Sequence, residues 1–232
     1  MRGVLRDQDR RAGAEKKGMN VHAMLLIGPT GVGKTPFGGY LEKRGFDGRR
    51  CFHFDFGHQL RAIAGHETAP DGFSRKEHSF IKDVLEKGAL LENEHFHIAE
   101  KIIDMFLRDR DFSGTDILVL NGLPRHTDQA RDMDRKVKTE AVIVLDCEAE
   151  DVFRRIGENT GGDRSGRTDD KIEMVRRKLD IFHERTAPLI GHYAAAGSDV
   201  CRVRVTASST VEDVYSDFIS MTNRLRFRTP DL

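Results

Sequence analysis

A glycine-rich stretch near the start of the chain constrains the fold more than any other feature. Residues 28–35 read Gly-Pro-Thr-Gly-Val-Gly-Lys-Thr and match the phosphate-binding pattern G-x-x-x-x-G-K-[ST]. The apolar run 21–27 precedes the pattern as a buried strand would, and a helical segment follows it. Glycines leave backbone N–H groups open to an anion, and the next helix adds further N–H groups and the positive end of its dipole. The pattern therefore predicts a strand, a loop and a helix that together bind a nucleoside triphosphate.

Two side chains of this stretch have expected roles beside the phosphates. We expect Lys34 to place its ammonium group between the β- and γ-phosphates, and the Thr35 hydroxyl to bind Mg²⁺. The predicted nucleotide-binding residues are Gly28, Pro29, Thr30, Gly31, Val32, Gly33, Lys34 and Thr35.

The rest of the chain alternates short apolar runs with longer segments of helical periodicity. The expected strands are 21–27, 51–56, 117–120, 141–145 and 200–205. Strands separated by helices are joined by right-handed crossovers, which place the strands parallel in one sheet. The sequence therefore predicts an α/β protein whose parallel sheet is covered by helices on both faces.

Capping patterns and apolar stripes predict the helices. Ser74 stands three residues before Glu77, as in a capping box, and opens a helix that Gly88 ends. The final helix begins behind Ser209 and Glu212, which have the same spacing. The apolar stripe of this final helix is Val211, Val214, Tyr215 and Phe218. Two further helical segments have the stripes Ile98, Ile102, Met105 and Phe106, and Ile172, Val175, Leu179 and Phe182.

Charge and apolar content exclude two classes of protein. The 38 Lys and Arg residues balance 38 Asp and Glu residues, so the chain has no net field to hold a long nucleic acid. The longest apolar runs, including 117–120 and 141–145, are far shorter than the roughly 20 residues that cross a bilayer. Cys51, Cys147 and Cys201 are widely spaced and typical of reduced thiols. We therefore expect a cytoplasmic protein without membrane contact.

The first residues of the chain differ from the rest. Residues 1–20 carry basic side chains, few apolar residues and no lasting periodicity. We interpret them as a flexible basic arm whose charges are solvated, with contact to a nucleic acid or an acidic partner as the alternative. Residues 21–232 are expected to form one domain, because a chain of this length can bury one core.

Several segments behind the glycine-rich loop resemble, in order, signatures of the adenylate kinases and related nucleoside monophosphate kinases. Asn121-Gly122-Leu123-Pro124-Arg125, with Gln129 four residues on, resembles the pattern D-G-F-P-R-x-x-x-Q. Residues 57–61 resemble G-D-x-L-R, and residues 88–91 resemble the family segment beside the acceptor base. Residues 166–170 resemble G-R-x-D-D, and residues 186–190 resemble T-x-P-L-I. The resemblance implies the P-loop NTPase fold, with a five-stranded parallel sheet flanked by helices, a helical acceptor-binding insertion at 57–95 and a short lid at 156–168.

The resemblance also implies a reaction. It implies a monomeric phosphotransferase that uses ATP and Mg²⁺ and moves the γ-phosphoryl group to a nucleoside monophosphate, AMP before others. The implied catalytic residues are Lys34, Arg125, Arg155, Arg167 and Lys178, with Arg155 over the ATP base. The implied acceptor-binding residues are Arg61, Leu91, Gly122, Arg125, Gln129 and Arg167. The implied Mg²⁺ ligands are Thr35 directly and Asn121, or Asp169 and Asp170, through water.

The chain departs from the family pattern mainly on the acceptor and metal side. Asn121 stands where the family has aspartate, and His58 stands where it has the aspartate of G-D-x-L-R. Phe56 replaces a small hydroxyl residue, and Lys178 replaces an arginine. Two alternatives therefore stay open: a P-loop kinase of another small metabolite, and an ATP-binding regulatory protein without catalysis.

Overall fold

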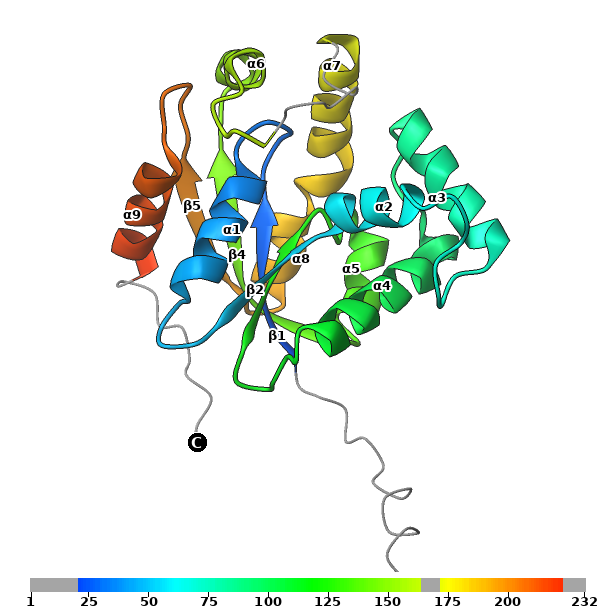
Figure 1. Ribbon diagram of the computed structural model, residues 1–232. Helices are drawn as coiled ribbons and strands as arrows, with labels where there is room; N and C mark the ends of the chain where they lie inside the picture. The colour runs from blue at the N-terminus through cyan, green and yellow to red at the C-terminus, as the bar shows by residue number, and fades with distance from the viewer. Residues whose placement is uncertain (1–20, 164–171, 223–232) are drawn as a thin grey trace, which may run out of the picture.

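Five parallel strands form one sheet in the order β2-β3-β1-β4-β5 (Figure 1). The computed structural model describes residues 21–163 and 172–222, so the predicted basic arm lies outside the described residues. The predicted α/β class with a five-stranded parallel sheet is confirmed. The strands are β1, Val21–Ile27; β2, Cys51–Asp55; β3, Ile117–Asn121; β4, Val137–Asp146; and β5, Asp199–Arg204.

Both faces of the sheet are buried under helices. All seven residues of β1 are buried, and their side chains alternate between the faces, with Leu25 on one and Leu26 on the other. The helices on the face of Leu25 are α4 (Phe96–Asp109), α5 (Thr127–Met133) and α8 (Leu189–Ala195). The helices on the face of Leu26 are α1 (Lys34–Arg44) and α9 (Val211–Thr222).

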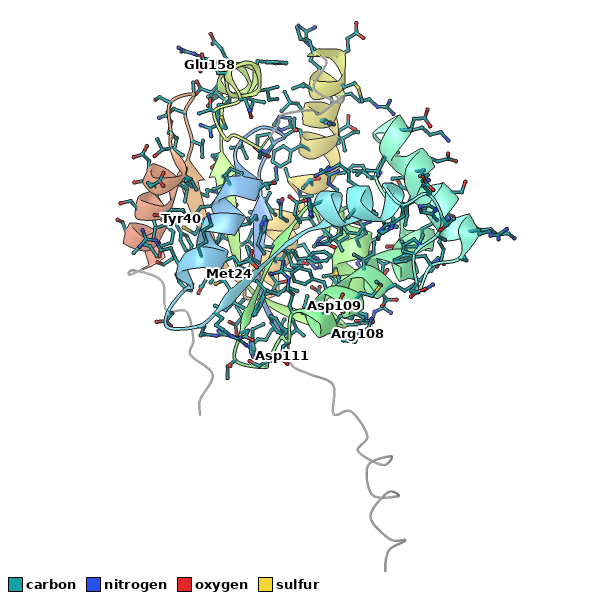
Figure 2. The ribbon with its side chains drawn as sticks, in the orientation of Figure 1. Met24, Tyr40, Arg108, Asp109, Asp111 and Glu158 are labelled. Carbon is teal, nitrogen blue, oxygen red and sulfur yellow. The ribbon has the colours of Figure 1, made fainter. Side chains whose placement is uncertain are left out.

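The contact between α1 and α9 is partly aromatic. Tyr40 of α1 faces α9, where its ring lies 5.0 Å from the ring of Tyr215 (Figure 2). Phe218 of α9 meets Phe37 of α1 edge to face, with 5.7 Å between ring centroids. The helix after the glycine-rich loop is therefore fixed from outside as well as by the sheet.

Between β2 and β3 the chain leaves the sheet and forms a helical pair. α2 (Phe56–Ala64) and α3 (Arg75–Lys87) pack against each other beside the carboxyl end of β2 (Figure 1). The Ser74 Oγ accepts the N–H of Glu77, the Glu77 carboxylate accepts the N–H of Ser74, and Gly88 ends α3 in the left-handed region at φ 58°. The predicted capping box and glycine stop are confirmed.

Two helices stand above the carboxyl ends of the strands, at the top of Figure 1: α6 (Ala149–Glu158) and α7 (Ile172–Ile181). Residues 156–158, predicted as the start of the lid, are the last turn of α6. Residues 164–168 of the predicted lid lie outside the described residues. Ile172 was expected on an apolar stripe but is 63% exposed, because only Val175 and Leu179 of α7 pack against Val152 of α6.

Other local expectations are wrong at their boundaries. β4 begins at Val137, four residues before the expected strand 141–145. Phe56 is the first residue of α2 and not the end of a strand, because the Asp55 carboxylate caps α2 by accepting the N–H of His58. The capping pair of α9 is Thr210 and Asp213, one residue later than predicted.

The C-terminal part of the chain has elements that no sequence pattern indicated. A turn of π-helix (Phe182–Thr186) follows α7, and Pro188 then opens α8.

Cys51 and Cys201 are buried, Cys147 is half-buried, and all three are thiols. Within the part of the chain that the structure describes, no helix has the length and apolar content to cross a membrane.

Candidate active site

The glycine-rich loop joins the carboxyl end of β1 to the first residue of α1. Gly31 and Gly33 have φ values of 79° and 103°, which side-chain-bearing residues rarely adopt. A Cβ atom on Gly31 would also lie 2.5 Å from the Ile156 side chain of α6. The loop therefore needs glycine at both positions, and α6 supports it from behind.

Lys34 lies across this loop at the start of α1. Its Nζ donates hydrogen bonds to the carbonyl oxygens of Gly28 and Pro29, each over 2.7 Å. These contacts hold the ammonium group at the loop, where a phosphate bound by the N–H groups of the loop would meet it.

A cleft of about 180 Å³ opens in front of the loop. Four cationic side chains from different parts of the chain line it, and all four are among the predicted site residues: Lys34, Arg61, Arg125 and Lys178. The other predicted residues in its lining are Thr30, Gly31, Gly33, Thr35, Leu91 and Gly122. Of the remaining loop residues, Gly28 lines the adjoining cavity, whereas Pro29 and Val32 are buried.

Arg125 stands on the segment between β3 and α5, after the cis peptide bond of Leu123–Pro124. The Thr186 hydroxyl donates to the Arg125 carbonyl oxygen over 2.9 Å, so the end of the π-helical turn fixes this segment. Protein atoms around the Arg125 guanidinium lower its pKa, and the charge of Asp55 raises it. Arginine stays protonated in proteins, so Arg125 is a fixed cation of the cleft.

Part of the cleft has an apolar wall. Leu60 of α2 and Val84 of α3 face the cleft together with Leu90 and Leu91 from the segment after Gly88. All four side chains are buried, so the wall is a fixed part of the structure. Its chemistry suits the flat, apolar face of a nucleotide base.

Gln129, predicted to hydrogen-bond the acceptor base, is 1% exposed and does not line the cleft. Its Nε2 donates to the Leu91 carbonyl oxygen over 2.5 Å, and its Oε1 accepts the N–H of Arg125 over 2.9 Å. The side chain therefore ties two segments of the cleft wall together. Base recognition by Gln129 stays a prediction.

Arg155, predicted to lie over the ATP base, is 4% exposed and lies behind the glycine-rich loop. Its guanidinium donates to the carbonyl oxygens of Gly31, Thr206 and Ser209 over 3.4, 2.8 and 2.9 Å. Burial lowers its pKa. The contacts make Arg155 a link between the loop and the segment after β5, and contact with a base stays a prediction.

Asp55 is the functional candidate that sequence reasoning missed. It ends β2, lines the cleft, and accepts the Thr35 hydroxyl over 2.6 Å. Burial by itself raises the pKa of the Asp55 carboxyl, but hydrogen bonds from Thr35 and from the His58 N–H outweigh it, so its pKa lies below the usual value. The signal in the sequence was an acid at the carboxyl end of a parallel strand, which is where such sheets bind ligands.

The oxygen atoms at this point fit a magnesium ion. Mg²⁺ takes oxygen ligands and keeps several waters, and proteins hold it with one or two carboxylates together with substrate phosphates. Thr35 and Asp55 supply a hydroxyl and a carboxylate beside the phosphate loop. Asn121 lies next to them. The other predicted Mg²⁺ ligands, Asp169 and Asp170, lie outside the described residues, as does the predicted phosphate-binding residue Arg167.

A phosphate loop that faces arginine side chains across one cleft, at the carboxyl edge of a parallel sheet, is the arrangement of a P-loop kinase. The family model for adenylate kinase matches residues 26–198. The chain belongs to the adenylate kinase family, whose members are nucleoside monophosphate kinases with ATP and Mg²⁺ as phosphoryl donor.

Three similar proteins illustrate the range of this family. The chain is 30% identical to the uridylate kinase of Saccharomyces cerevisiae, over 85% of this chain and 88% of that protein. It is 26% identical to UMP-CMP kinase 1 of Oryza sativa subsp. japonica, over 86% and 73% of the two chains. It is also 26% identical to the adenylate kinase of Parabacteroides distasonis, over 88% of this chain and 98% of that protein.

Proposed function

We propose that this protein transfers the γ-phosphoryl group of ATP to AMP. The observation that carries the proposal is the single cleft that brings Lys34 of the phosphate loop together with Arg61, Arg125 and Lys178. Two polyanionic nucleotides need such a set of cations to approach each other. We call the part of the cleft formed by residues 28–35 the donor side, and the part formed by residues 56–61, 84–91 and 122–125 the acceptor side.

The side chains of the cleft have distinct tasks in this reaction. Lys34 binds the β- and γ-phosphates of the donor, and Arg61 and Arg125 grip the acceptor phosphate, each through a planar guanidinium that can bind two oxygens. Lys178 adds positive charge where the transferred group spreads its negative charge over the equatorial oxygens. Mg²⁺, held by Thr35 with the phosphates, neutralises part of that charge when bound. No side chain forms a covalent intermediate.

The apolar wall of the acceptor side supports a nucleotide as the acceptor. Leu60, Val84, Leu90 and Leu91 offer a surface for a base in the same cleft as Arg61 and Arg125. The name of the matching family model, adenylate kinase, supports AMP as the first candidate. Pyrimidine monophosphates are the second candidate, because two of the similar proteins are named for uridylate or for UMP and CMP.

A coupled assay with Mg²⁺·ATP against AMP, GMP, UMP and CMP tests the proposal. We expect turnover with AMP and the highest kcat/KM for it. A higher kcat/KM with UMP or CMP would replace AMP as the acceptor and leave the reaction class intact. ATP binding without turnover of any monophosphate would contradict the function and favour a regulatory nucleotide-binding protein.

We also propose that the protein works as a cytoplasmic monomer. The balance of 38 basic and 38 acidic residues supports the absence of a nucleic-acid partner. Size-exclusion chromatography with light scattering tests the oligomeric state.

A further inference from the structure

The acid at the carboxyl edge of the sheet stands on β2 and not on β3. Asn121 ends β3 where the family pattern has aspartate, and Asp55 ends β2, directly opposite in the register of the two strands. The side chains are in contact, since the Asn121 Nδ2 donates to the Asp55 Oδ2 over 2.9 Å. Two carboxylates at this distance would repel each other, so an amide on one strand and an acid on the other is the compatible pair.

Asp55 also contacts the threonine that ends the phosphate loop. The Thr35 Oγ1 donates its proton to the Asp55 Oδ2 over 2.6 Å and accepts the Asn121 Nδ2 over 3.2 Å. A hydroxyl has one proton and two lone pairs, so one lone pair of Thr35 remains for a further partner. Asp55 thereby fixes the direction in which Thr35 presents that lone pair.

Exposure separates the two strand-end residues. Asp55 lines the cleft together with Lys34 and Thr35. Asn121 is 4% exposed and is not part of the lining. A hydrated metal ion beside the phosphate loop would therefore reach the carboxylate of Asp55 before the amide of Asn121.

We propose that Asp55 is the carboxylate that positions Mg²⁺ for this phosphate loop, in place of a residue at the end of β3. It accepts the hydroxyl of the metal ligand Thr35 and hydrogen bonds from water on the metal. Partners of metal ligands fix the orientation of those ligands, and their loss typically weakens metal binding about 10- to 100-fold. The inference rests on the use of ATP with Mg²⁺ and does not depend on which acceptor the enzyme uses.

One other acid lines the cleft and serves as the matched control. Asp163 lies near Gly161, where an added Cβ atom would meet the Asp163 Oδ1 at 2.8 Å. No contact between Asp163 and Thr35 is present among the described interactions of that hydroxyl. Asp163→Asn removes the same charge from the same cleft without touching the Thr35 hydroxyl.

The test measures the binding of Mn²⁺, a spectroscopic substitute for Mg²⁺. The protein is mixed with the β,γ-imido analogue of ATP, and no acceptor is present. Electron paramagnetic resonance gives the affinity for Mn²⁺, and calorimetry gives the affinity for the analogue in EDTA. The variants are Asp55→Asn, Asp55→Ser, Asp163→Asn and the double variant Asp55→Asn with Asn121→Asp. Asparagine and serine both cap helices, so α2 keeps its N-cap in the Asp55 variants.

We expect Asp55→Asn and Asp55→Ser to weaken Mn²⁺ binding by about tenfold or more, with analogue affinity in EDTA unchanged. The double variant should bind Mn²⁺ as weakly as Asp55→Asn, because a carboxylate at position 121 would stand behind residue 55 and outside the lining of the cleft. Wild-type Mn²⁺ affinity in both Asp55 variants, or the main loss in Asp163→Asn, would overturn the proposal. Because no acceptor is present, a protein that fails to phosphorylate AMP still decides this question.

Discussion

The donor side of the cleft comes from one contiguous stretch of chain, whereas the acceptor side is assembled from three separated segments. Residues 28–35 shape the donor side through main-chain geometry, with Gly31 and Gly33 at positive φ. The acceptor side depends on side-chain contacts between segments, such as Gln129 bound to Leu91 and Arg125. Two departures from the family pattern, Phe56 and His58, fall on the side that side chains build. A loop made by the main chain tolerates little change, and a wall made by side chains can be rebuilt.

The largest predicted effect is on the donor side. Lys34→Ala removes the ammonium group that lies across the loop, and kcat should fall on the order of 10³-fold, because a fixed cation for the transferred charge is lost. Steady-state kinetics with Mg²⁺·ATP and AMP measures the loss, and thermal unfolding controls for folding. A kcat within tenfold of the wild type would mean that the donor side does not depend on this lysine.

The next effect is on the acceptor side. Arg125→Ala and Arg61→Ala should each lower kcat/KM for AMP by on the order of 10²-fold while KM for ATP stays near the wild-type value. The matched control is Arg131→Ala on α5, whose guanidinium pairs with Asp128 at the surface and which should leave both constants unchanged. An equal rise in KM for ATP would show that these arginines also serve the donor, and would contradict the division of the cleft into a donor side and an acceptor side.

A third prediction concerns the link within the acceptor side. Gln129→Ala leaves the Leu91 carbonyl and the Arg125 N–H without their buried partner, which should cost roughly 1–3 kcal/mol of stability. Urea unfolding in the absence of nucleotide measures this cost. Gln59→Ala on α2, which is half-buried, is the control. An unchanged urea midpoint for Gln129→Ala would contradict a structural role for the amide and leave base recognition as its remaining role.

The smallest effect concerns α3, on the acceptor side. A hydrogen bond from Lys101 over 2.6 Å, together with those from Ser74, lowers the pKa of Glu77 to about 2 against the burial that raises it. Since the folded pKa lies below the unfolded one, the stabilisation is complete above pH 4.5 or so and is lost as the pH falls toward 2. Its size is about 1 kcal/mol, because solvent screens this ion pair.

Glu77→Gln tests that assignment. The wild type should lose more stability than Glu77→Gln between pH 5 and pH 3, when unfolding is followed by circular dichroism at several pH values. Parallel pH curves for the two proteins would show that the Glu77 carboxylate is not held in its ionised form.

The donor side could be predicted from sequence because its parts are neighbours in the chain. Local chemistry also predicted the Ser74 cap and the Gly88 stop of α3. The acceptor cations Arg61 and Arg125 were found through motifs, and the structure places both in one cleft. Their meeting with Lys34 follows from the parallel sheet, which brings the carboxyl ends of its strands to one edge.

Long-range contacts account for what sequence reasoning missed. The role of Asp55 depends on Thr35 and on Asn121, which is 66 residues away along the chain. The partners of the Gln129 and Arg155 side chains are main-chain groups, which leave no trace in residue type. The Phe56 boundary was misplaced because an apolar residue suits the end of a strand and the start of a buried helix equally well.

The position of β1 and the contacts of Arg155 have a consequence for the newly made chain. β1 is synthesised before the other strands but lies between β3 and β4, and Arg155 joins Gly31 to the carbonyls of Thr206 and Ser209. The loop after β1 is therefore synthesised long before Arg155, Thr206 and Ser209, the residues that complete its contacts. The full set of contacts that supports the phosphate loop is therefore complete only after β5 and the segment that follows it have been synthesised.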